Sequence, residues 1–315
     1  MRLLHLVLGA QVAVVHQFKR PPYGGGNQFL LALTGELRRM GFDVGARAIG
    51  PRTRQVLFNS FNFDMSWLRH KLRDRKARGI RTIHRVDGPI SAYRGQDFHV
   101  DEEIFEINRE LADVTVFQSE FSRAKHRDIG LDFTGETAVI MNAVDPSIFY
   151  PDLDVRPLEA QDRKVRIVAS SWSDNRRKGA DVFEWLDENL DFSRYEMTFV
   201  GNVKCEFRNI RRCPAVPSAA LAAELRAHDI YVAASLNDPC SNALTEALAC
   251  GLPAVYRKSG GHPEIVKKAG LGFDNAEEVP ELLDRIVQNH AAYRASIEIP
   301  SIASVATRYA ALLGA

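Results

Sequence analysis

The sequence predicts an α/β chain of two doubly wound parallel-sheet domains that face each other across a cleft. The first observation is an alternation of short Val- and Ile-rich apolar runs with stretches of helical spacing. Strands that are apolar throughout and alternate with helices indicate a parallel sheet covered on both faces. The second observation is a pause in this alternation at residues 150–164, after which the pattern begins again. The third is the length, since 315 residues exceed what one hydrophobic core usually supports.

Five apolar runs in the first half of the chain are expected to be strands, and three stretches of helical spacing lie between them. The expected strands are residues 3–8, 55–59, 81–86, 114–118 and 137–141. The expected helices are residues 29–37, 101–112 and 120–128. The first run follows Arg2 as in a signal peptide, but it lacks a small-residue cleavage site, so we interpret it as a buried strand.

The second half repeats the pattern after the polar, proline-containing stretch 150–164, which we interpret as a linker. Strands are expected at residues 165–170, 196–200, 230–234 and 253–257. Helices are expected at residues 179–190, 218–228, 242–250, 263–269, 279–295 and 301–313. The predicted domains are residues 1–150 and 164–298. Because open parallel sheets bind ligands at the carboxyl ends of their strands, we expect the active site in the cleft between the domains.

Composition and charge exclude several classes of protein. Hydrophobic residues make up 45% of the chain and charged residues 26%, as in ordinary globular enzymes. The net charge of +1 gives no reason to expect a nucleic-acid partner. No apolar run approaches the roughly 20 residues that span a bilayer. The four cysteines form neither a CxxC pair nor a zinc-binding pattern, so we expect free thiols in the cytoplasm.

The most specific pattern surrounds the start of the helix expected at residues 242–250. An apolar strand precedes it, and Asp238 lies in the turn between them. Ser241 and Asn242 are both good residues to cap a helix. The amides of Ser241, Asn242 and Ala243 at the helix start carry a partial positive charge, and this arrangement suits a phosphate group.

Two acidic residues flank this helix start. Asp238 precedes it, and Glu246 follows eight residues later, about one turn inside the helix. A carboxylate offers only acceptors, so either side chain suits a pair of sugar hydroxyls. An alanine-rich helix, a Gly-x-Pro strand start and a Gly-Gly-x-x-Glu turn follow, the last two beginning at Gly251 and Gly260. Either acid alone would be interpreted as a solvated side chain, whereas the whole set favours a sugar-nucleotide site.

This set resembles the retaining family 4 glycosyltransferases, the glycosyl transferases group 1, which have the GT-B fold. The resemblance implies two Rossmann-like domains and a last helix, residues 301–313, that crosses back to pack on the first domain. It implies that Asp238 contacts hydroxyls of the donor sugar and that Glu246 contacts those of the ribose. The family usually has Glu at the first position, so the shorter Asp leaves the identity of the sugar open.

A basic loop follows the first expected strand of the second half and contains Arg176, Arg177 and Lys178. In the resembled family a loop Arg and a Lys before Gly neutralise the donor diphosphate, and Lys178 matches the Lys. Trp172 occupies the strand end where the family has its Arg, so Arg176 or Arg177 is the substitute, and Arg177 is the candidate. Such cations stabilise the charge that a leaving diphosphate gains. The family also places a glycine near the base, where Gly201 ends the next strand, and a plain turn is the alternative.

The amino-terminal half offers less specific candidates. Gly25, Gly26 and Asn27 belong to a glycine-rich turn before a helix, which lets the backbone approach a phosphate, and a purely structural turn is the alternative. The resemblance implies that this turn lies against the donor phosphates and the acceptor. His84 lies on an apolar strand in the region where the family often has a His that touches the donor sugar, and Asp87 is the second choice. A single His on such a strand is often a core residue instead.

Residues 67–81 contain seven Lys and Arg side chains against one Asp, with Trp67, Leu68 and Leu72 as a narrow apolar stripe. One interpretation is a helix that lies on an anionic membrane, at the inner membrane face, or that binds an anionic acceptor. The other interpretation, which we favour, is the solvated outer face of a helix that covers the sheet.

The sequence therefore predicts glycosyl transfer from a nucleoside-diphosphate sugar to an acceptor hydroxyl of a glycan, lipid or small molecule. The resemblance implies that the anomeric configuration is retained. We expect no metal, because cationic side chains and helix termini take its place, and no cofactor besides the donor substrate. Two alternatives stay open, namely a sugar-nucleotide 2-epimerase of similar fold and a non-catalytic sugar-nucleotide-binding protein. The sequence does not determine the sugar, the base or the acceptor.

Overall fold

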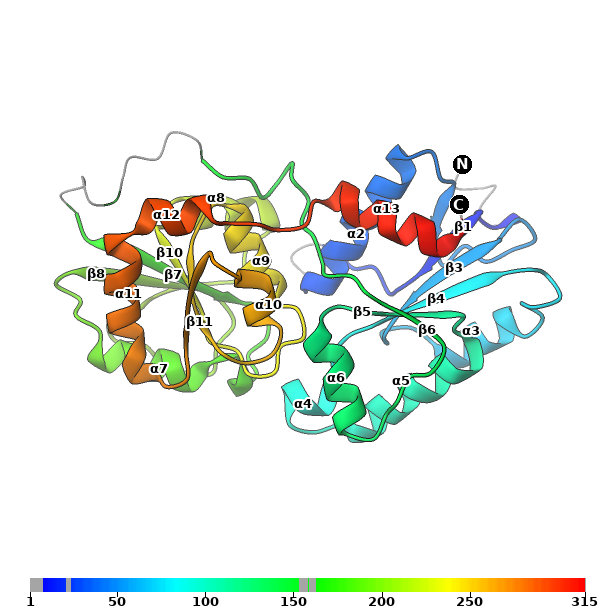
Figure 1. Ribbon diagram of the computed structural model, residues 1–315, viewed down its shortest axis with the longest axis horizontal. Coiled ribbons are helices and arrows are strands. Elements are labelled where there is room, and N and C mark those ends of the chain that lie inside the picture. Colours follow the sequence, from blue (N-terminus) through cyan, green and yellow to red (C-terminus); the bar gives the residue numbers. More distant parts are fainter. Residues whose placement is uncertain (1–7, 21–23, 153–157, 159–162, 315) are drawn as a thin grey trace. The chain divides into compact units, whose positions relative to one another are not determined.

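The computed structural model describes residues 8–20, 24–152, 158 and 163–314 (Figure 1). The chain forms two compact units. Unit 1 takes its described residues from Met1–Lys19, Phe29–Asn142 and Pro300–Ala315, and unit 2 takes its own from Arg20–Gln28 and Ala143–Ile299. Residues 143–150 and the glycine-rich segment with Gly25, Gly26 and Asn27, which we expected in the first domain, thus belong to unit 2.

Unit 1 contains a parallel six-stranded sheet with the order β2-β1-β3-β4-β5-β6. Its strands are β1 (Val12–Val15), β2 (Val44–Ala46), β3 (Gln55–Asn59), β4 (Arg81–Val86), β5 (Val114–Phe117) and β6 (Glu136–Val139). The register sets Phe58 of β3 opposite His84 of β4, and His84 opposite Thr115 of β5. The side chains of β1 and β5 are buried throughout, as in a strand covered on both faces.

Helices cover both faces of the unit 1 sheet (Figure 1). They are α2 (Gly25–Arg39), α3 (Met65–Leu72), α4 (Ile90–Arg94), α5 (Phe98–Leu111), α6 (Glu120–Asp128) and α13 (Ile302–Leu313). On one face α3 and α5 share a hydrophobic core with β1 and β3. On the other face α2 and α13 lie side by side, with the ring centroids of Phe29 and Tyr309 6.3 Å apart. The predicted return of the last helix to the first domain is confirmed.

The first strand of unit 1 lies later in the chain than we expected. Residues 3–7 of the expected strand are outside the described residues, and Leu8 is exposed and lies in no strand. The strand is instead β1, whose four apolar residues are fully buried. Its short Val-rich run fits a strand covered on both faces better than the Leu-rich run before it.

Residues 67–81 do not form one continuous helix. The Asp64 side chain caps α3 by accepting a hydrogen bond from the Trp67 amide at 2.9 Å, and the helix ends at Leu72. The chain then turns, with Gly79 at a φ of 61°, and β4 begins at Arg81. One helix over all of residues 67–81 is impossible, because Arg81 is the first residue of β4 and pairs with Gln55 of β3.

Unit 2 contains a second parallel six-stranded sheet, with the order β12-β11-β10-β7-β8-β9. Its strands are β7 (Val165–Ser171), β8 (Tyr195–Gly201), β9 (Arg211–Cys213), β10 (Ile230–Ala233), β11 (Ala254–Arg257) and β12 (Gly270–Phe273). From β7 the order runs through β8 to β9, and from β10 it runs the other way to β12. The neighbouring carboxyl ends of β7 and β10 are therefore the topological switch point, where sheets of this type bind ligands.

The helices of unit 2 surround this sheet. They are α7 (Ala180–Asn189), α8 (Ser218–Arg226), α9 (Asn242–Ala249), α10 (His262–Val266), α11 (Val279–Gln288) and α12 (His290–Ala295), with the short helices η2 (Arg176–Lys178) and η3 (Ala276–Glu278). One hydrophobic core joins α7 and α11 to the strands, and α9 lies against α8 and α10. Among the described residues no helix combines the length and the apolar character that crossing a membrane requires.

Candidate functional site

An ion pair joins the two loops at the switch point of unit 2. Lys178 ends the short helix η2 after β7, and Asp238 lies in the loop after β10. Lys178 Nζ lies 2.7 Å from Asp238 Oδ2. The two loops are also joined through their backbones, since the Leu236 amide donates to the Arg177 carbonyl at 2.8 Å. Two residues that the sequence singled out separately thus form one cation–carboxylate pair at the expected edge of the sheet.

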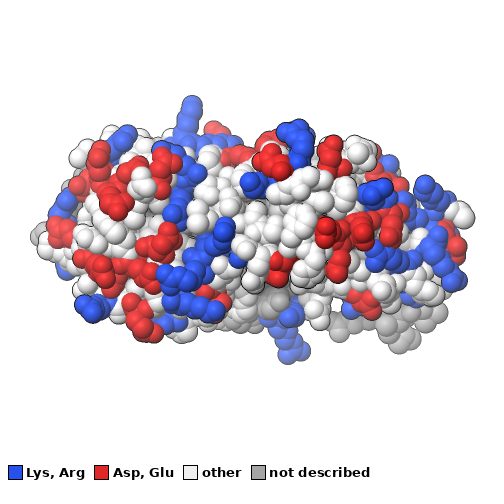
Figure 2. Space-filling model, turned by 90° about the horizontal axis from the view of Figure 1, so that it is seen from below, with Lys and Arg blue, Asp and Glu red and all other residues white. Residues whose placement is uncertain are grey.

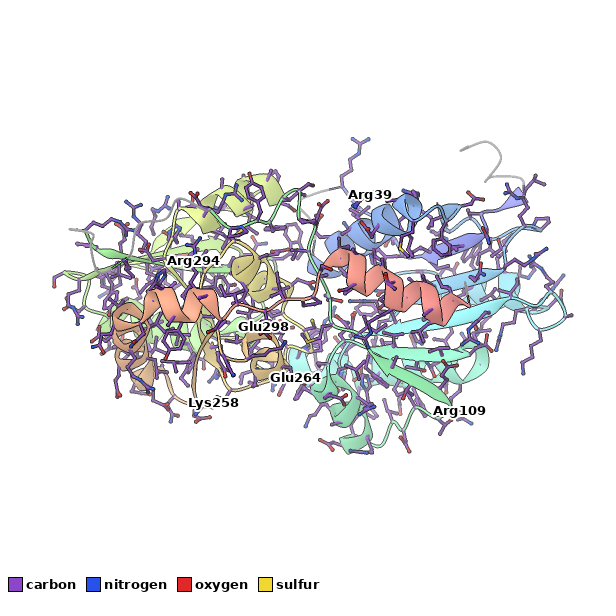
Figure 3. All side chains as sticks on the ribbon, turned by 45° about the horizontal axis from the view of Figure 1, so that its top comes forward. Arg39, Arg109, Lys258, Glu264, Arg294 and Glu298 are labelled. Carbon is purple, nitrogen blue, oxygen red and sulfur yellow. The ribbon has the colours of Figure 1, made fainter. Side chains whose placement is uncertain are left out.

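The glycine pair holds the backbone of Asp238 in place. The Gly261 amide donates to the Asp238 carbonyl at 2.8 Å. A Cβ atom on Gly260, whose φ is 66°, would overlap that same carbonyl oxygen. Lys258 and Glu264, which are labelled in Figure 3, flank this turn in the sequence. The Lys258 ammonium group donates to Asp274 Oδ2 at 2.6 Å. The Gly-Gly-x-x-Glu turn therefore supports the acidic loop by close backbone approach.

The surroundings of Asp238 keep its side chain ionised although it is buried. Burial alone would raise the pKa of this carboxyl group. The charge of Lys178, with hydrogen bonds from Lys178 and from the Cys240 amide, outweighs burial and holds the pKa below its usual value. Asp238 thus presents a carboxylate whose oxygens are fixed from several sides, as binding of a polyol requires.

Glu246 lies one turn inside α9 in a different environment. Ser241 caps this helix, and its Oγ accepts from the Leu244 amide at 3.4 Å. The side chain of Glu246 has no hydrogen-bond or ion-pair partner among the residues that the structure describes, and the residue is 8% exposed. Burial raises the pKa of its carboxyl group to about 8. An unpaired buried carboxyl is costly for a protein that has no use for it, which makes Glu246 a candidate ligand-binding group.

The three basic residues of η2 have different roles. Arg176 is exposed and pairs with Glu184 of α7 at 2.8 Å, so its charge is directed to the outer surface. Arg177 is partly exposed, and its amide is capped by the side chain of Asn175 at 2.9 Å. Of the two arginines that could replace the expected strand-end Arg, Arg176 is thus engaged by Glu184, and the assignment of Arg177 stays a prediction.

Gly201 serves the packing of two strands. Its φ is 118°, and a Cβ atom there would overlap the carbonyl oxygen of Ser171 at the end of β7. The Asn202 amide donates to the same Ser171 oxygen at 2.9 Å. These contacts account for the glycine as a turn beside β7, the alternative that the sequence left open.

The glycine-rich segment, which we expected as a turn before the helix, forms the first turn of α2 and approaches the start of α9 within unit 2. A Cβ atom on Gly25 would overlap the side chain of Asn242, whereas one on Gly26 would meet nothing within 4 Å. The side chain of Asn27 is buried, and its amide donates to the Gly24 carbonyl at 3.1 Å. Gly25 is therefore the residue of this turn whose lack of a side chain matters for packing on the candidate phosphate site.

The structure corrects the interpretation of His84 as a group that touches the donor sugar. His84 is fully buried in the middle of β4, stacked on Phe58 with ring centroids 4.2 Å apart. Its Nδ1 lies 3.0 Å from Asn108 Nδ2. Burial lowers the pKa of the imidazole to about 3, so the ring is neutral. His84 is a core residue of unit 1.

Asp87, the second choice, lies at the carboxyl end of β4 and is partly exposed. Arg85 Nη1 contacts its Oδ1 at 3.0 Å. Arg85 is itself fully buried and also donates to Asn59 Oδ1 at 2.6 Å and to Asn142 Oδ1 at 2.8 Å. These contacts hold Arg85 inside unit 1, so its side chain does not turn outward toward a ligand.

Most arginines of residues 67–81 have partners inside unit 1. Arg69 pairs with Glu110, Arg75 with Asp113 and Arg81 with Glu136. Arg75 is buried, and its Nη1 lies 2.9 Å from both carboxylate oxygens of Asp113. On the face of the molecule shown in Figure 2, basic and acidic side chains are interspersed. These contacts favour the interpretation of this segment as an ordinary outer surface.

Two residues of the site were not assigned from the sequence. Ser235 lies three residues before Asp238, and its Oγ is 3.5 Å from Asp238 Oδ2. His262 follows the glycine pair, and its Nε2 is 3.1 Å from the same Ser235 oxygen. Both lie inside the pattern that the sequence singled out. Neither position carried a signal, because a His after two glycines indicates no particular contact.

Comparison with known proteins agrees with this geometry. Residues 188–289, about a third of the chain, match the family described as glycosyl transferases group 1. The matched segment lies within unit 2. It contains the Asp238–Glu246 pattern and the glycine pair, so the predicted resemblance is confirmed where its motifs lie. No curated protein sequence matches the chain significantly.

Solved structures of glycosyltransferases share the fold of the whole chain. The catalytic domain of starch synthase IV from Arabidopsis thaliana, bound to ADP and acarbose, is 11% identical with a TM-score of 0.72, over 97% of this chain and 99% of that one. HepE from Anabaena, in complex with UDP and glucose, is 12% identical with a TM-score of 0.70, over 97% and 100%. Sucrose-phosphate synthase from Thermosynechococcus elongatus is 17% identical with a TM-score of 0.68, over 96% and 94%. At such identities the likeness shows the GT-B fold, as predicted.

Proposed function

We propose that the protein transfers a sugar from a nucleoside-diphosphate sugar to an acceptor hydroxyl, with retention of the anomeric configuration and without a metal or cofactor. The observation that carries the proposal is the ion pair between Lys178 and Asp238, 2.7 Å apart, beside the start of α9. The pair puts a cation suited to phosphate next to a carboxylate suited to sugar hydroxyls. Glu246, one turn further along α9, is the group for the ribose hydroxyls.

The proposed reaction breaks the bond between the sugar C1 and the phosphate oxygen and forms a bond from C1 to the acceptor oxygen on the same face. The bonding electrons leave with the nucleoside diphosphate, and the acceptor proton passes to the leaving phosphate oxygen. Negative charge thus grows on the phosphate in the transition state. Lys178 and the amides of Ser241, Asn242 and Ala243 are fixed in place to stabilise it, which is the contribution a metal ion would otherwise make.

Two further observations support the proposal. HepE has been solved in complex with UDP-glucose and starch synthase IV with ADP, so proteins of this fold hold nucleoside diphosphates and their sugars. The four cysteines of the chain are free, which fits a protein that works in the cytoplasm. A glycan, a lipid or a small molecule is each compatible with the site as the acceptor.

A screen of nucleoside-diphosphate sugars by thermal denaturation tests the proposal. A donor at a hundredfold excess over its Kd adds about 2.7 kcal/mol of stability, which corresponds to a rise in Tm of about 5 °C. We expect one donor to raise the Tm of the parent protein and to have a much smaller effect on a Glu246→Ala variant. If that variant binds and turns over the donor like the parent, the site is assigned wrongly.

Incubation with the identified donor alone distinguishes transfer from epimerisation. A transferase releases nucleoside diphosphate only when it finds an acceptor hydroxyl or, slowly, water. The appearance of a sugar inverted at C2 in the absence of any acceptor would show a 2-epimerase instead. A donor that is bound but never converted, with any acceptor tried, would indicate a binding protein.

A further inference from the structure

A chain of hydrogen bonds reaches Asp238 from the far side of the site. His262 Nδ1 lies 3.0 Å from the Arg257 carbonyl oxygen, and His262 Nε2 lies 3.1 Å from Ser235 Oγ. Ser235 Oγ in turn lies 3.5 Å from Asp238 Oδ2. His262 is fully buried and Ser235 nearly so. The imidazole is therefore anchored at both nitrogens and cannot serve as a solvent-exposed acid or base.

The protons of this chain can be assigned from the partners. The Arg257 carbonyl can only accept, so His262 Nδ1 carries a hydrogen and donates it. Burial lowers the pKa of His262 although Asp238 opposes that change, so the ring is neutral and Nε2 accepts. Lys178 and Arg257 are the cations that face the ring. Ser235 has one hydroxyl hydrogen for two acceptors, and the shorter contact, 3.1 Å to His262 Nε2 against 3.5 Å to Asp238 Oδ2, indicates that the hydroxyl points to His262 in the free protein.

Binding of the donor is expected to change which group accepts the hydrogen bond from the Ser235 hydroxyl. In the free protein Lys178 is the strong donor to Asp238 Oδ2, at 2.7 Å. A diphosphate that binds beside Lys178 competes with Asp238 for the ammonium group. The hydrogen bond from Lys178 to Oδ2 is then weakened. The Ser235 hydroxyl is the neighbouring group that can turn from His262 and donate to Oδ2 in place of Lys178. A carboxylate left without a donor in a buried site is costly and poorly oriented.

We propose that Ser235 and His262 are positioning residues that hold the carboxylate of Asp238 for the donor sugar while Lys178 engages the diphosphate. The inference rests on the proposed function, in which Asp238 binds the sugar. His262 holds the Ser235 hydroxyl in reach of Oδ2, and Ser235 supplies the hydrogen bond. The hydrogen bond from Ser235 to Asp238 matters when the diphosphate is bound and the negative charge on the phosphate grows. Loss of this hydrogen bond should therefore change kcat more than KM.

Removal of the hydroxyl tests the proposal. We expect Ser235→Ala to lower kcat roughly 5- to 20-fold with KM changed less than threefold, as for loss of one hydrogen bond to a charged group. Ser235→Thr keeps a hydroxyl and should restore most of the activity. His262→Asn keeps a donor for the Arg257 carbonyl but has no group at the position of Nε2, so it should lower kcat in the same way. If the residues act through one chain, the double variant loses no more than Ser235→Ala alone.

Unit 2 provides a matched control. His228 is partly buried and has the same two kinds of partner, with Nδ1 2.7 Å from the Glu224 carbonyl and Nε2 3.1 Å from Thr198 Oγ1. Neither residue contacts the Asp238 loop. We expect His228→Asn and Thr198→Ala to leave kcat and KM unchanged per folded molecule, with folding checked from the Tm of each variant.

The outcomes separate the two claims. A Ser235→Ala variant within twofold of the parent in kcat, while Asp238→Asn is strongly impaired, would overturn the positioning role and leave the proposed function standing. Equal losses in the His228 and Thr198 variants, or additive losses in the double variant, would also overturn it, because packing alone would then explain the effect. An Asp238→Asn variant as active as the parent would overturn the proposed function itself.

Discussion

A Lys178→Met variant is expected to lose roughly 10²- to 10³-fold in kcat, the effect of removing one preorganised charge from a transition state in which negative charge develops. Met keeps much of the length of the side chain and removes the ammonium group. The variant also leaves Asp238 without its nearest cation, and burial will then raise the pKa of that carboxyl group. Steady-state kinetics at saturating donor measures the loss.

Lys258→Met is the control for this prediction. Lys258 is also a lysine of unit 2 and also pairs with an Asp, but the pair with Asp274 is exposed. Its replacement is expected to change kcat by less than twofold, because an exposed pair contributes little. Comparable kinetics for the two variants would mean that Lys178 has no special part in the reaction.

A Glu246→Gln variant is expected to be more stable than the parent and to bind donor roughly 10- to 100-fold more weakly. The carboxyl group has a folded-state pKa of about 8 against a usual value of 4.5. Between these values the folded protein holds a proton that the unfolded chain has released, so the stability of the parent falls as the pH rises from about 4.5 to about 8. Glutamine carries no such proton, and the variant gains on the order of 3 kcal/mol at pH 8 relative to pH 5.

The loss of donor affinity has a separate reason. A carboxylate can accept hydrogen bonds from two vicinal hydroxyls, whereas an amide offers one acceptor and two donors. Because the ionised form binds, donor affinity of the parent should rise with pH up to about 8, and that of the variant should not. Chemical denaturation and donor titration at both pH values measure the two effects, with Glu281→Gln on an exposed position of α11 as the control. A stability difference independent of pH would contradict this account of Glu246.

The strand and helix pattern of both units could be predicted from the sequence because its physical causes are local. The fully apolar run of β10, the cap at Ser241 and the eight-residue spacing from Asp238 to Glu246 each depend on neighbours in the chain. What failed depends on contacts distant in sequence. His84 lies on a central strand whose residues are buried on both faces, so alternation could not tell an outward side chain from an inward one.

The charged residues show the same limit. Nothing in the sequence pairs Lys178 with Asp238 or Arg75 with Asp113, because each pair joins segments that only the sheet order brings together. Likewise the role of Gly260 follows from its approach to one carbonyl oxygen and not from the turn pattern. The site could thus be located from its motif, whereas its internal contacts required the fold.

A crystal structure of the protein with its identified donor is the most direct test of the central claim, that the Asp238–Glu246 segment and Lys178 hold a nucleoside-diphosphate sugar. The account predicts electron density with the diphosphate at Lys178 and the start of α9, the ribose hydroxyls on the Glu246 carboxylate and the sugar hydroxyls on Asp238. Donor density elsewhere on the protein, with Lys178 still paired to Asp238 and Glu246 unoccupied, would contradict it.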